Sequence, residues 1–546
     1  MPALLAILGG ALLLVWPALL NGYPILFSDT GGLLDMGLAG DMGWDKPWVY
    51  GPFLALTSAG LTLWGPVAAQ GLLLSHLLWL TQAVMAPPRP GRHLALCAVL
   101  ASATAAPWFA ALLMPDIFAP LVLLSLFVLA YGPGRVSRAA LAWAGVVGTL
   151  AVASHLAHLV LAAGVVAVAG LLRRQLPWRP AIPIAAALLF LLGSNLVGNG
   201  VLAVSPYGSV FALARLIGDG PGRAYVDAAC PAAGWRICAW QGRLSADSDE
   251  FLWHPNGPIW ADGYGPIRYA PEAARLVPAI IAAHPGAVLQ AAAANTLHQL
   301  GLVRVGDTLV ADHLDVALLP RLQQYFPPQE ATAFRASLQA ADRLAAAAAP
   351  FTPLHLAVLV AGAAGTLWIA LGLALTRRSP ASKPTLTPHG EDQSLIPHNE
   401  EQNPIGHCDE QSLVPHGEEQ TLLRHCEERS DAAIQGPHGP DAGRPRITMP
   451  QAARNDPANQ ATRNDSSKGP WRWPYTRKNP LQALAILTLA GLLANAAATG
   501  ALSGPHHRYQ ARIAWLVVLP PLLAYAARKD ASCRDTSAGA MWTSAS

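Results

Sequence analysis

The stretch ALLAILGGALLLVWPALLNGYPILFSDTGG, residues 3–32, joins a long apolar run to a carboxylate, Asp29, that lies among aromatic residues and glycines. The apolar part, 3–21, has the length of about 20 residues that a helix needs to cross a bilayer. It has neither a basic segment before it nor an A-x-A cleavage site after it, so we expect an uncleaved helix rather than a signal peptide. Asp29 therefore follows closely after the chain leaves the membrane.

The composition predicts a membrane protein. Hydrophobic residues make up 53% of the 546 residues and charged residues only 13%, against about 25% charged in soluble domains. We expect an all-α polytopic fold with about ten membrane helices, because backbone groups in lipid must be satisfied within each helix. The expected spans are 3–21, 66–86, 94–113, 116–132, 138–154, 157–173, 181–203, 353–376, 480–500 and 511–527. The net charge of +3 is small and the basic residues form no stripe, so nothing favours nucleic-acid binding.

The basic loops predict the orientation. With ten spans they all fall on one side, which the positive-inside rule makes cytoplasmic. These loops contain Arg89 and Arg92, Arg135 and Arg138, Arg173 and Arg174, Arg377 and Arg378, and Arg528 and Lys529. We therefore expect a protein of a bacterial inner membrane with both termini in the cytoplasm. The outer loop, 22–65, contains a broken apolar stretch at 48–64 that predicts an interfacial helix rather than a crossing.

The rest of the chain divides by composition. Residues 1–203 form the expected membrane core, and 204–352 an outer, periplasmic and mainly helical soluble domain. Cys230 and Cys238 lie in that domain, and an oxidising compartment favours a disulfide between them over a metal site. The remaining segments are a span within 353–378, a linker at 379–475, two spans within 476–530 and a tail at 531–546.

The linker 379–475 repeats nine-residue units such as PHGEDQSLI and PHGEEQTLL. Its low hydrophobicity and repetition predict disorder, which we also expect for the tail. Two units contain His-Cys pairs, but no unit has the C-x-x-C spacing of a zinc site. We assign the linker no chemistry.

The sequence has no phosphate-binding G-x-x-x-x-G-K-[ST] motif, no H-E-x-x-H and no G-x-S-x-G. What remains is a set of ionisable residues in turns on the expected outer side: Asp29, Asp116 in LLMPDIFAP, and His155 and His158 in VASHLAHLV. We expect them to face one outer cavity. Each also has a structural interpretation: a loop charge for Asp29, a helix cap for Asp116 and interfacial packing for the two histidines.

This order of features resembles integral-membrane glycosyltransferases of the GT-C class, which use polyprenyl-phosphate-linked sugars. FSDTGG with Asp29 is similar to the acidic motif after their first helix, and MPDIFAP with Asp116 to their second acidic motif. DKPWVYGPFLAL, which begins at Asp45, resembles the stretch that enters their interfacial helix. The resemblance covers roughly residues 1–205. Lys46 stands where Arg is common, and Gly31 and Gly32 stand where related loops often bring an aromatic residue.

The resemblance implies transfer of a sugar from a polyprenyl-phosphate donor to an acceptor on the periplasmic side. Asp29 would act as general base, and Asp116 would position the acceptor or bind a divalent metal together with Asp29. Charged groups would stabilise the leaving phosphate. The expected substrate contacts are Asp45, Lys46, Tyr50, His155, His158 and Arg215. We expect the two catalytic carboxylates to lie near each other with a basic group between them.

The alternative is a non-enzymatic membrane protein, either a lipid-carrier transporter or an envelope-assembly scaffold. A transporter would place ionisable residues near the middle of its spans, often with inverted repeats. The expected spans are nearly free of charge and show no such repeat. A scaffold would leave Asp29 and Asp116 far apart.

Overall fold

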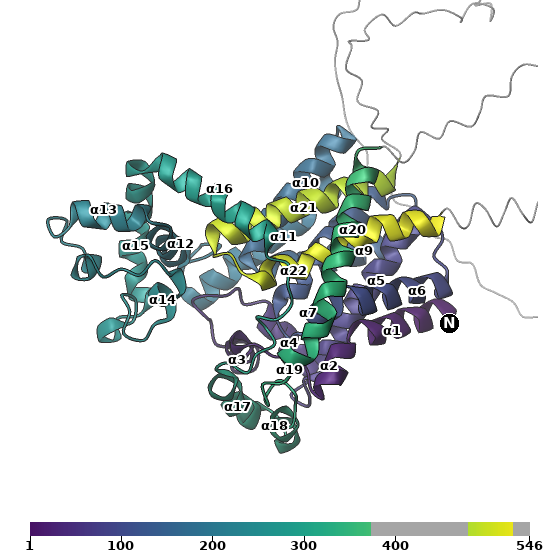
Figure 1. The fold of residues 1–546 in the computed structure, drawn as a ribbon, viewed down its shortest axis with the longest axis horizontal. Coiled ribbons are helices and arrows are strands. Elements are labelled where there is room, and N and C mark those ends of the chain that lie inside the picture. Colours follow the sequence, from purple (N-terminus) through teal and green to yellow (C-terminus); the bar gives the residue numbers. More distant parts are fainter. Residues whose placement is uncertain (373–478, 528–546) are drawn as a thin grey trace, which may run out of the picture. The chain divides into compact units, whose positions relative to one another are not determined.

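The computed structural model describes residues 1–372 and 479–527 (Figure 1). Within these ranges all regular structure is helical, apart from isolated bridges such as Ile25 with Leu112. Six described helices are long and apolar enough to cross a membrane, or seven if one bent pair is counted as a span. The all-α, multi-pass class is therefore confirmed, whereas ten spans are not. The repeat linker and the tail lie outside the described residues.

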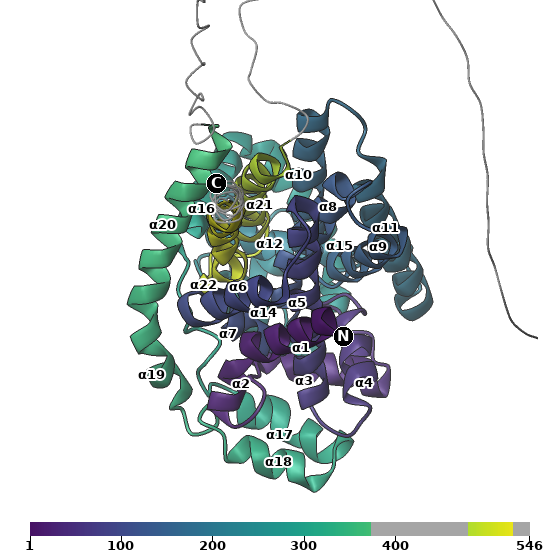
Figure 2. The same cartoon turned by 90° about the vertical axis from the view of Figure 1, so that its right-hand side faces the viewer.

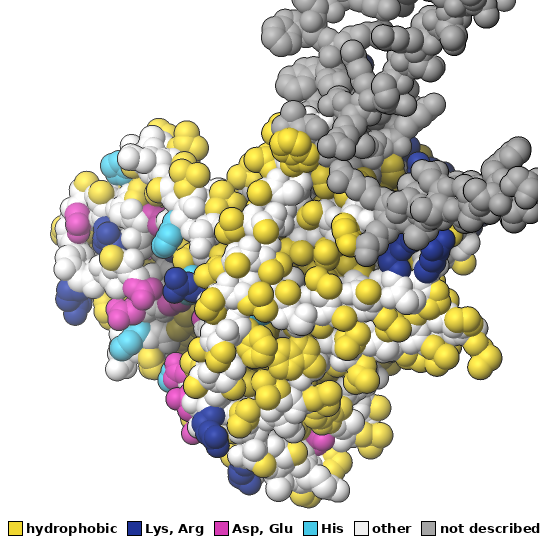
Figure 3. Space-filling model, turned by 45° about the vertical axis from the view of Figure 1, so that its right-hand side comes forward, with side chains coloured by type: hydrophobic (Ala, Val, Ile, Leu, Met, Phe, Trp, Pro, Cys, Tyr) yellow, Lys and Arg dark blue, Asp and Glu magenta, His cyan; other side chains and the backbone are white. Residues whose placement is uncertain are grey.

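Most expected spans coincide with helices of the structure, with small shifts at their ends. These helices are α5 (Trp64–Met85), α8 (Phe118–Tyr131), α9 (Arg138–Ala153), α10 (Leu156–Arg173), α11 (Trp178–Asn199), α20 (Thr352–Ala370), α21 (Pro480–Leu502) and α22 (His507–Ala514), which continues through η6 (Trp515–Val518) to Ala527. Hydrophobic side chains cover the middle of the face drawn in Figure 3, and charged side chains gather at its margins. Such a surface suits a protein whose helices lie in lipid.

Two expected spans are broken. The first consists of α1 (Pro2–Leu14) and α2 (Trp16–Asn21), and 94–113 consists of α6 (Pro90–Ala103) and α7 (Ala106–Ala111). The second helix of each pair has a proline as its second residue, Pro17 or Pro107. Proline has no N–H and clashes with the preceding turn, so it favours the first turn of a new helix over the interior of a continuous one. An apolar run alone does not show this break.

The outer loop 22–65 folds into short helices. They are α3 (Ser28–Leu34), the π-helical turn η1 (Asp35–Ala39) and α4 (Tyr50–Ser58). The expected interfacial helix at 48–64 is thus only the nine residues of α4. It ends at Ala59 and Gly60, which both have positive φ values. The backbone turns sharply there, because residues in this conformation do not continue a right-handed helix.

Segment 204–352 is not a single soluble domain. Its first part, the lobe at 208–283, has its own core and comprises α12 (Gly208–Asp219), α13 (Pro221–Ala229), η3 (Arg236–Trp240), α14 (Ser248–Trp253), η4 (Ala261–Gly263) and α15 (Pro266–Ala283). The predicted disulfide between Cys230 and Cys238 is present in it. The last part, α17 (Leu314–Tyr325), α18 (Pro328–Arg335), α19 (Leu344–Ala348) and η5 (Ala349–Phe351), joins the main core instead.

The helix between these parts, α16 (Pro285–Gly301), packs along α21 (Figure 1). With α15 it forms the bent pair that is apolar enough for a membrane span, at an angle of 99°. We expected α16 to lie in a soluble domain, but by length and composition this bent pair could also enter a membrane. The helix α16 is rich in alanine and has leucines on its outer face. Leu289 and Leu297 are 72% and 70% exposed, which is unusual for large apolar side chains of a soluble protein. Lipid would satisfy such a face.

The outer loop lies beside α17 and α18 (Figure 2), and buried polar contacts attach it to α18 and the chain after it. Tyr23 donates a hydrogen bond to Glu330 at 2.6 Å, and the Leu63 backbone N–H donates to the same carboxylate oxygen at 3.0 Å. The Gln339 side chain bonds both the N–H and the C=O of Leu26, at 3.0 and 2.7 Å. These contacts hold both ends of the loop, so the position of the residues between them is fixed by the folded core.

Replacing Glu330 with alanine should destabilise the protein by about 2 kcal/mol or more, because two buried donors would lose their acceptor. Glu330→Gln should lose much less, since an amide oxygen can accept both bonds. The measurement is the unfolding midpoint in detergent. Glu250→Ala is the matched control, because Glu250 is exposed. Equal effects of Glu330→Ala and the control would contradict the role of this contact.

Candidate functional site

The site lies at one end of α8. Asp116 immediately precedes this helix, and the opposite end meets the basic loops. There Arg173 donates to the carbonyl of Ala130, and Arg135 donates to that of Val84 at the end of α5, at 2.9 Å. The site thus lies at the end of α8 opposite to the basic loops that contain Arg135 and Arg173. We call its six charged residues the ion cluster: Asp29, Asp45, Lys46, Asp116, Arg508 and Arg512.

Asp29 forms ion pairs with two cationic side chains. Its Oδ1 is 3.3 Å from Lys46 Nζ, and its Oδ2 is 3.7 Å from Arg508 Nη2. The side chain is 30% exposed. Burial alone would raise the pKa of Asp29, but Lys46 and Arg508 outweigh it and lower the pKa below its ordinary value. Asp29 is therefore ionised at neutral pH. Asp45 pairs with the same lysine.

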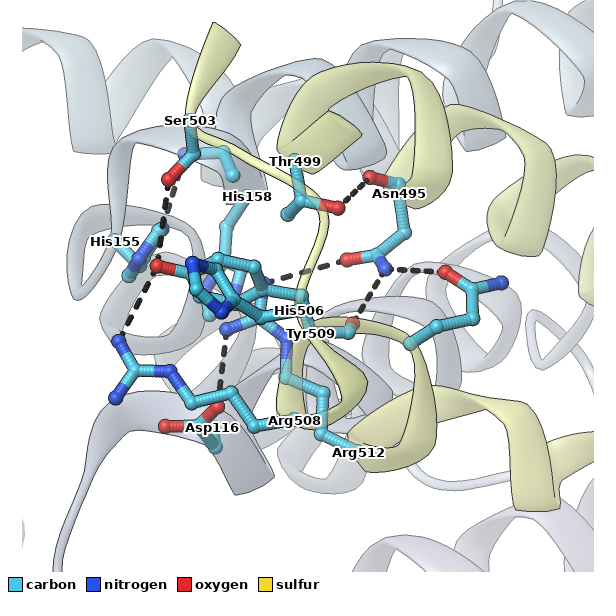
Figure 4. Close-up of polar contacts among 12 residues, drawn as sticks. Asp116, His155, His158, Asn495, Thr499, Ser503, His506, Arg508, Tyr509 and Arg512 are labelled. Carbon is cyan, nitrogen blue, oxygen red and sulfur yellow. Dashed lines mark hydrogen bonds and ion pairs between the residues drawn. The ribbon is translucent and has the colours of Figure 1, made fainter. Parts of the chain in front are cut away.

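Asp116 is buried and paired with Arg512. The carboxylate is 2% exposed and the guanidinium 0%, with Asp116 Oδ1 3.3 Å from Arg512 Nη1 (Figure 4). Arg512 also lies 3.4 Å from the side-chain oxygen of Asn495 in α21. Asp116 thus faces an arginine rather than open space. That Asp116 positions an acceptor stays a prediction; in the structure its carboxylate holds Arg512.

Arg508 is the basic group between the two carboxylates. It pairs with Asp29, and its charge also interacts with Asp116. Its guanidinium lies over the ring of Phe27, 4.4 Å from the centroid, and donates to the Tyr509 hydroxyl at 3.2 Å. Asp29 and Asp116 are therefore linked through Arg508 and Arg512, two cations that the sequence analysis did not single out.

Local structure explains why these side chains meet. Arg508 and Arg512 are four residues apart in α22 and so lie on one face of that helix. Thr30, next to Asp29, donates from its hydroxyl to the carbonyl of Leu113 at 3.0 Å. Leu113 in turn donates its N–H to Ile25 at 2.8 Å. These bonds keep the start of the outer loop beside the turn that carries Asp116.

The two histidines lie at the edge of the cluster, with ring centroids 5.2 Å apart. His155 is the N-cap of α10, and its Nδ1 accepts from the Ala157 N–H at 3.1 Å. His158 is fully buried, and its Nδ1 lies 2.7 Å from the carbonyl of Ala151. Burial and the charges of Arg512 and its neighbours hold the pKa of His155 well below its ordinary value of 6.5. His155 therefore supplies no positive charge.

Tyr50 and Arg215 have structural partners instead. Tyr50 is fully buried and donates to Gln70 at 2.5 Å, and Gln70 donates to the carbonyls of Ala110 and Leu112. Tyr50 thus supports the chain that leads to Asp116. Arg215 lies in the lobe, where it pairs with Asp219 and donates to Ser248 at 3.0 Å. Among the described residues the structure shows no contact between Arg215 and either Asp29 or Asp116.

A metal site is not apparent. No group of three or more His, Cys, Asp or Glu side chains that could hold a metal occurs within 1–372 and 479–527. Asp29 and Asp116 each face positively charged side chains. Since a cation would have to displace those side chains, the two carboxylates do not form a ready ligand pair.

The residues that complete the site come from the C-terminal part of the chain. Arg508, Tyr509, Arg512 and Asn495 had not been expected there. The signal was the stretch HHRYQAR, 506–512, in which two arginines at i and i+4 open an apolar run. Arg512 falls inside the predicted span 511–527, and a charge within a span calls for a buried partner. The partner itself, 396 residues away, could not be found from one sequence.

No protein-family model matches this chain, and no curated protein or solved structure matches it. The resemblance to GT-C glycosyltransferases therefore remains a hypothesis. It rests on three short sequence motifs and on their order along the chain.

Breaking the buried pair should destabilise the fold strongly. Asp116→Leu or Arg512→Met leaves an uncompensated buried charge, which costs about 3–5 kcal/mol. The double variant removes both charges and should be more stable than either single variant. A double-mutant cycle of unfolding midpoints in detergent tests this. Additive losses from the two substitutions would show that the pair is not coupled.

Stability should fall in acid partly through Asp29. Because its pKa is lowered by folding, its ion pairs stabilise fully above the ordinary value of 3.8 and are lost as the pH falls through the lowered value. Asp29→Asn should therefore flatten the acid limb of a plot of unfolding midpoint against pH. Asp41→Asn, an exposed position in the same loop, is the control. Identical acid limbs for Asp29→Asn and wild type would contradict the ion pairing.

Proposed function

We propose that the protein is a glycosyltransferase-like enzyme of a bacterial inner membrane, which moves a sugar from a polyprenyl-phosphate donor to an acceptor on the periplasmic side. The observation that carries this proposal is the partly exposed carboxylate of Asp29, held between Lys46 and Arg508 at one end of the membrane helices. A lipid-linked phosphate has its chain in lipid and its charge at headgroup depth. Cations at a helix end are placed to receive that charge.

The donor phosphate would compete with Asp29 for Lys46 and Arg508. Both cations would then neutralise the charge that grows on the phosphate as its bond to the sugar breaks. Each contact that Asp29 loses raises the pKa of its carboxyl, so donor binding would make Asp29 a stronger base. The acceptor oxygen attacks the sugar carbon, the carbon–oxygen bond to the phosphate breaks, and Asp29 takes the acceptor's proton.

The other members of the cluster would position these groups. Asp116 holds Arg512 and thereby fixes the face of α22 that carries Arg508. Asp45 keeps Lys46 within reach of Asp29. The substrate would thus meet Asp29, Lys46 and Arg508, while Asp116 and Asp45 act through their partners.

A lipid-carrier transporter is the second candidate, because Arg512 and Asp116 form a buried ion pair at a membrane helix. Such pairs also mark transport pathways. Both candidates bind a lipid phosphate, but only the enzyme breaks the bond between phosphate and sugar. Release of sugar onto an acceptor therefore separates them.

Asp29→Asn should reduce sugar transfer by about two to four orders of magnitude, because the amide keeps the shape but cannot accept the proton. The assay follows a labelled polyprenyl-phosphate sugar in membranes that contain the native acceptors. Asp41→Asn, in the same loop, should leave transfer unchanged.

Full activity of Asp29→Asn would refute the assigned base. An absence of transfer by the wild type, with movement of the labelled lipid between leaflets, would refute the enzyme and favour the transporter.

A further inference from the structure

His155 has an imidazole N–H that no described residue accepts. Its Nδ1 accepts a hydrogen bond from the Ala157 backbone N–H, so in the neutral ring the proton is on Nε2. The structure shows no hydrogen bond at Nε2 within the described ranges, and the residue is only partly buried. The helix N-cap thus fixes the tautomer and leaves one N–H donor free.

The charges around His155 keep its ring neutral. Arg508 and Arg512 of α22, Lys46 of the outer loop and His158 of α10 all act on it. A second proton on the ring would meet three cations. His155 is therefore a donor that carries no charge, with one orientation of its proton.

The ion cluster beside His155 contains other donors without acceptors. Arg508 Nη1 and Arg512 Nε are buried and have no hydrogen-bond partner within 1–372 and 479–527. His155 lies beside Tyr509 of the same helix, with ring centroids 6.5 Å apart (Figure 4). Buried N–H groups are rarely left unpaired in a folded protein. An excess of donors calls for a ligand rich in acceptors, such as a phosphate group.

We propose that His155 binds a phosphate oxygen of the ligand through Nε2–H, as a neutral donor whose tautomer is set by the Ala157 N–H. This inference rests on the proposed function and adds a specific contact to it. Lys46 and Arg508 contribute charge, which acts in all directions. His155 contributes a directed hydrogen bond, which fixes the orientation of the phosphate.

Two substitutions separate the donor from the helix cap. His155→Gln keeps an N–H at a reach similar to Nε2 but is a poor N-cap. His155→Asn is a favoured N-cap but is too short to place a donor there. We therefore expect His155→Gln to keep phosphate binding and lose thermal stability. We expect His155→Asn to keep thermal stability and lose phosphate binding. A purely structural role would move both properties together.

The experiment measures binding of polyprenyl monophosphate in detergent micelles, and separately of inorganic phosphate, to the purified full chain by tryptophan fluorescence. His155→Asn should weaken phosphate binding about tenfold to a hundredfold, the usual loss for a hydrogen bond to a charged group. His155→Gln should bind within a few-fold of wild type, with a lower Tm. Weaker binding of either ligand by His155→Asn supports the contact. The ligand that wild type binds more tightly, polyprenyl monophosphate or inorganic phosphate, identifies the source of the phosphate.

The failures are distinguishable. If wild type binds phosphate and both variants bind it as tightly as wild type, His155 makes no contact with phosphate, while the proposed function stands. If the asparagine variant keeps its affinity and the glutamine variant loses it, the inference is also wrong. If wild type binds neither polyprenyl phosphate nor inorganic phosphate, both the inference and the proposed function fall.

Discussion

The ion pair between Asp116 and Arg512 is the contact on which the site depends. It joins the turn before α8 to α22, and both groups are almost wholly removed from solvent. A charge in such surroundings is tolerated only with a partner. The register of α22 against the rest of the core therefore follows from this pair. Once Arg512 is placed, Arg508 one turn earlier lies on the same face of α22, where it pairs with Asp29.

The start of α22 is held by further contacts. The Arg508 backbone N–H donates to Asp307 at 2.9 Å, and Gln299 of α16 bonds both the N–H and the carbonyl of His506. Free N–H groups at a helix start need acceptors, and Asp307 supplies one. The C-terminal helices thus belong to the same core as the N-terminal ones, although the linker separates them in the sequence.

Apolar length predicted the class of the fold and most helix positions, because lipid demands helices of a certain length. It did not predict the breaks at Pro17 and Pro107, where local backbone chemistry overrides hydropathy. The overall composition of 204–352, with its charges and turns, led us to assign the whole segment to a soluble domain. The apolar helix α16 within it was not recognised. In the site, short motifs predicted Asp29, Lys46 and Asp116. Pairing across hundreds of residues depends on tertiary structure. The sequence therefore did not predict that Arg508 and Arg512 belong to the site.

The separation of Asp116 and Arg512 by 396 residues has a consequence for synthesis of the protein. A ribosome adds about 5–20 residues per second, so Asp116 is made roughly 20–80 s before its partner. During that interval the carboxyl group has no arginine, and protonation or water must satisfy it. The site can therefore form only when the last membrane segment has been inserted. A chain interrupted before α22 would lack both arginines of the ion cluster and the part of the main core that Trp515 and Leu516 supply.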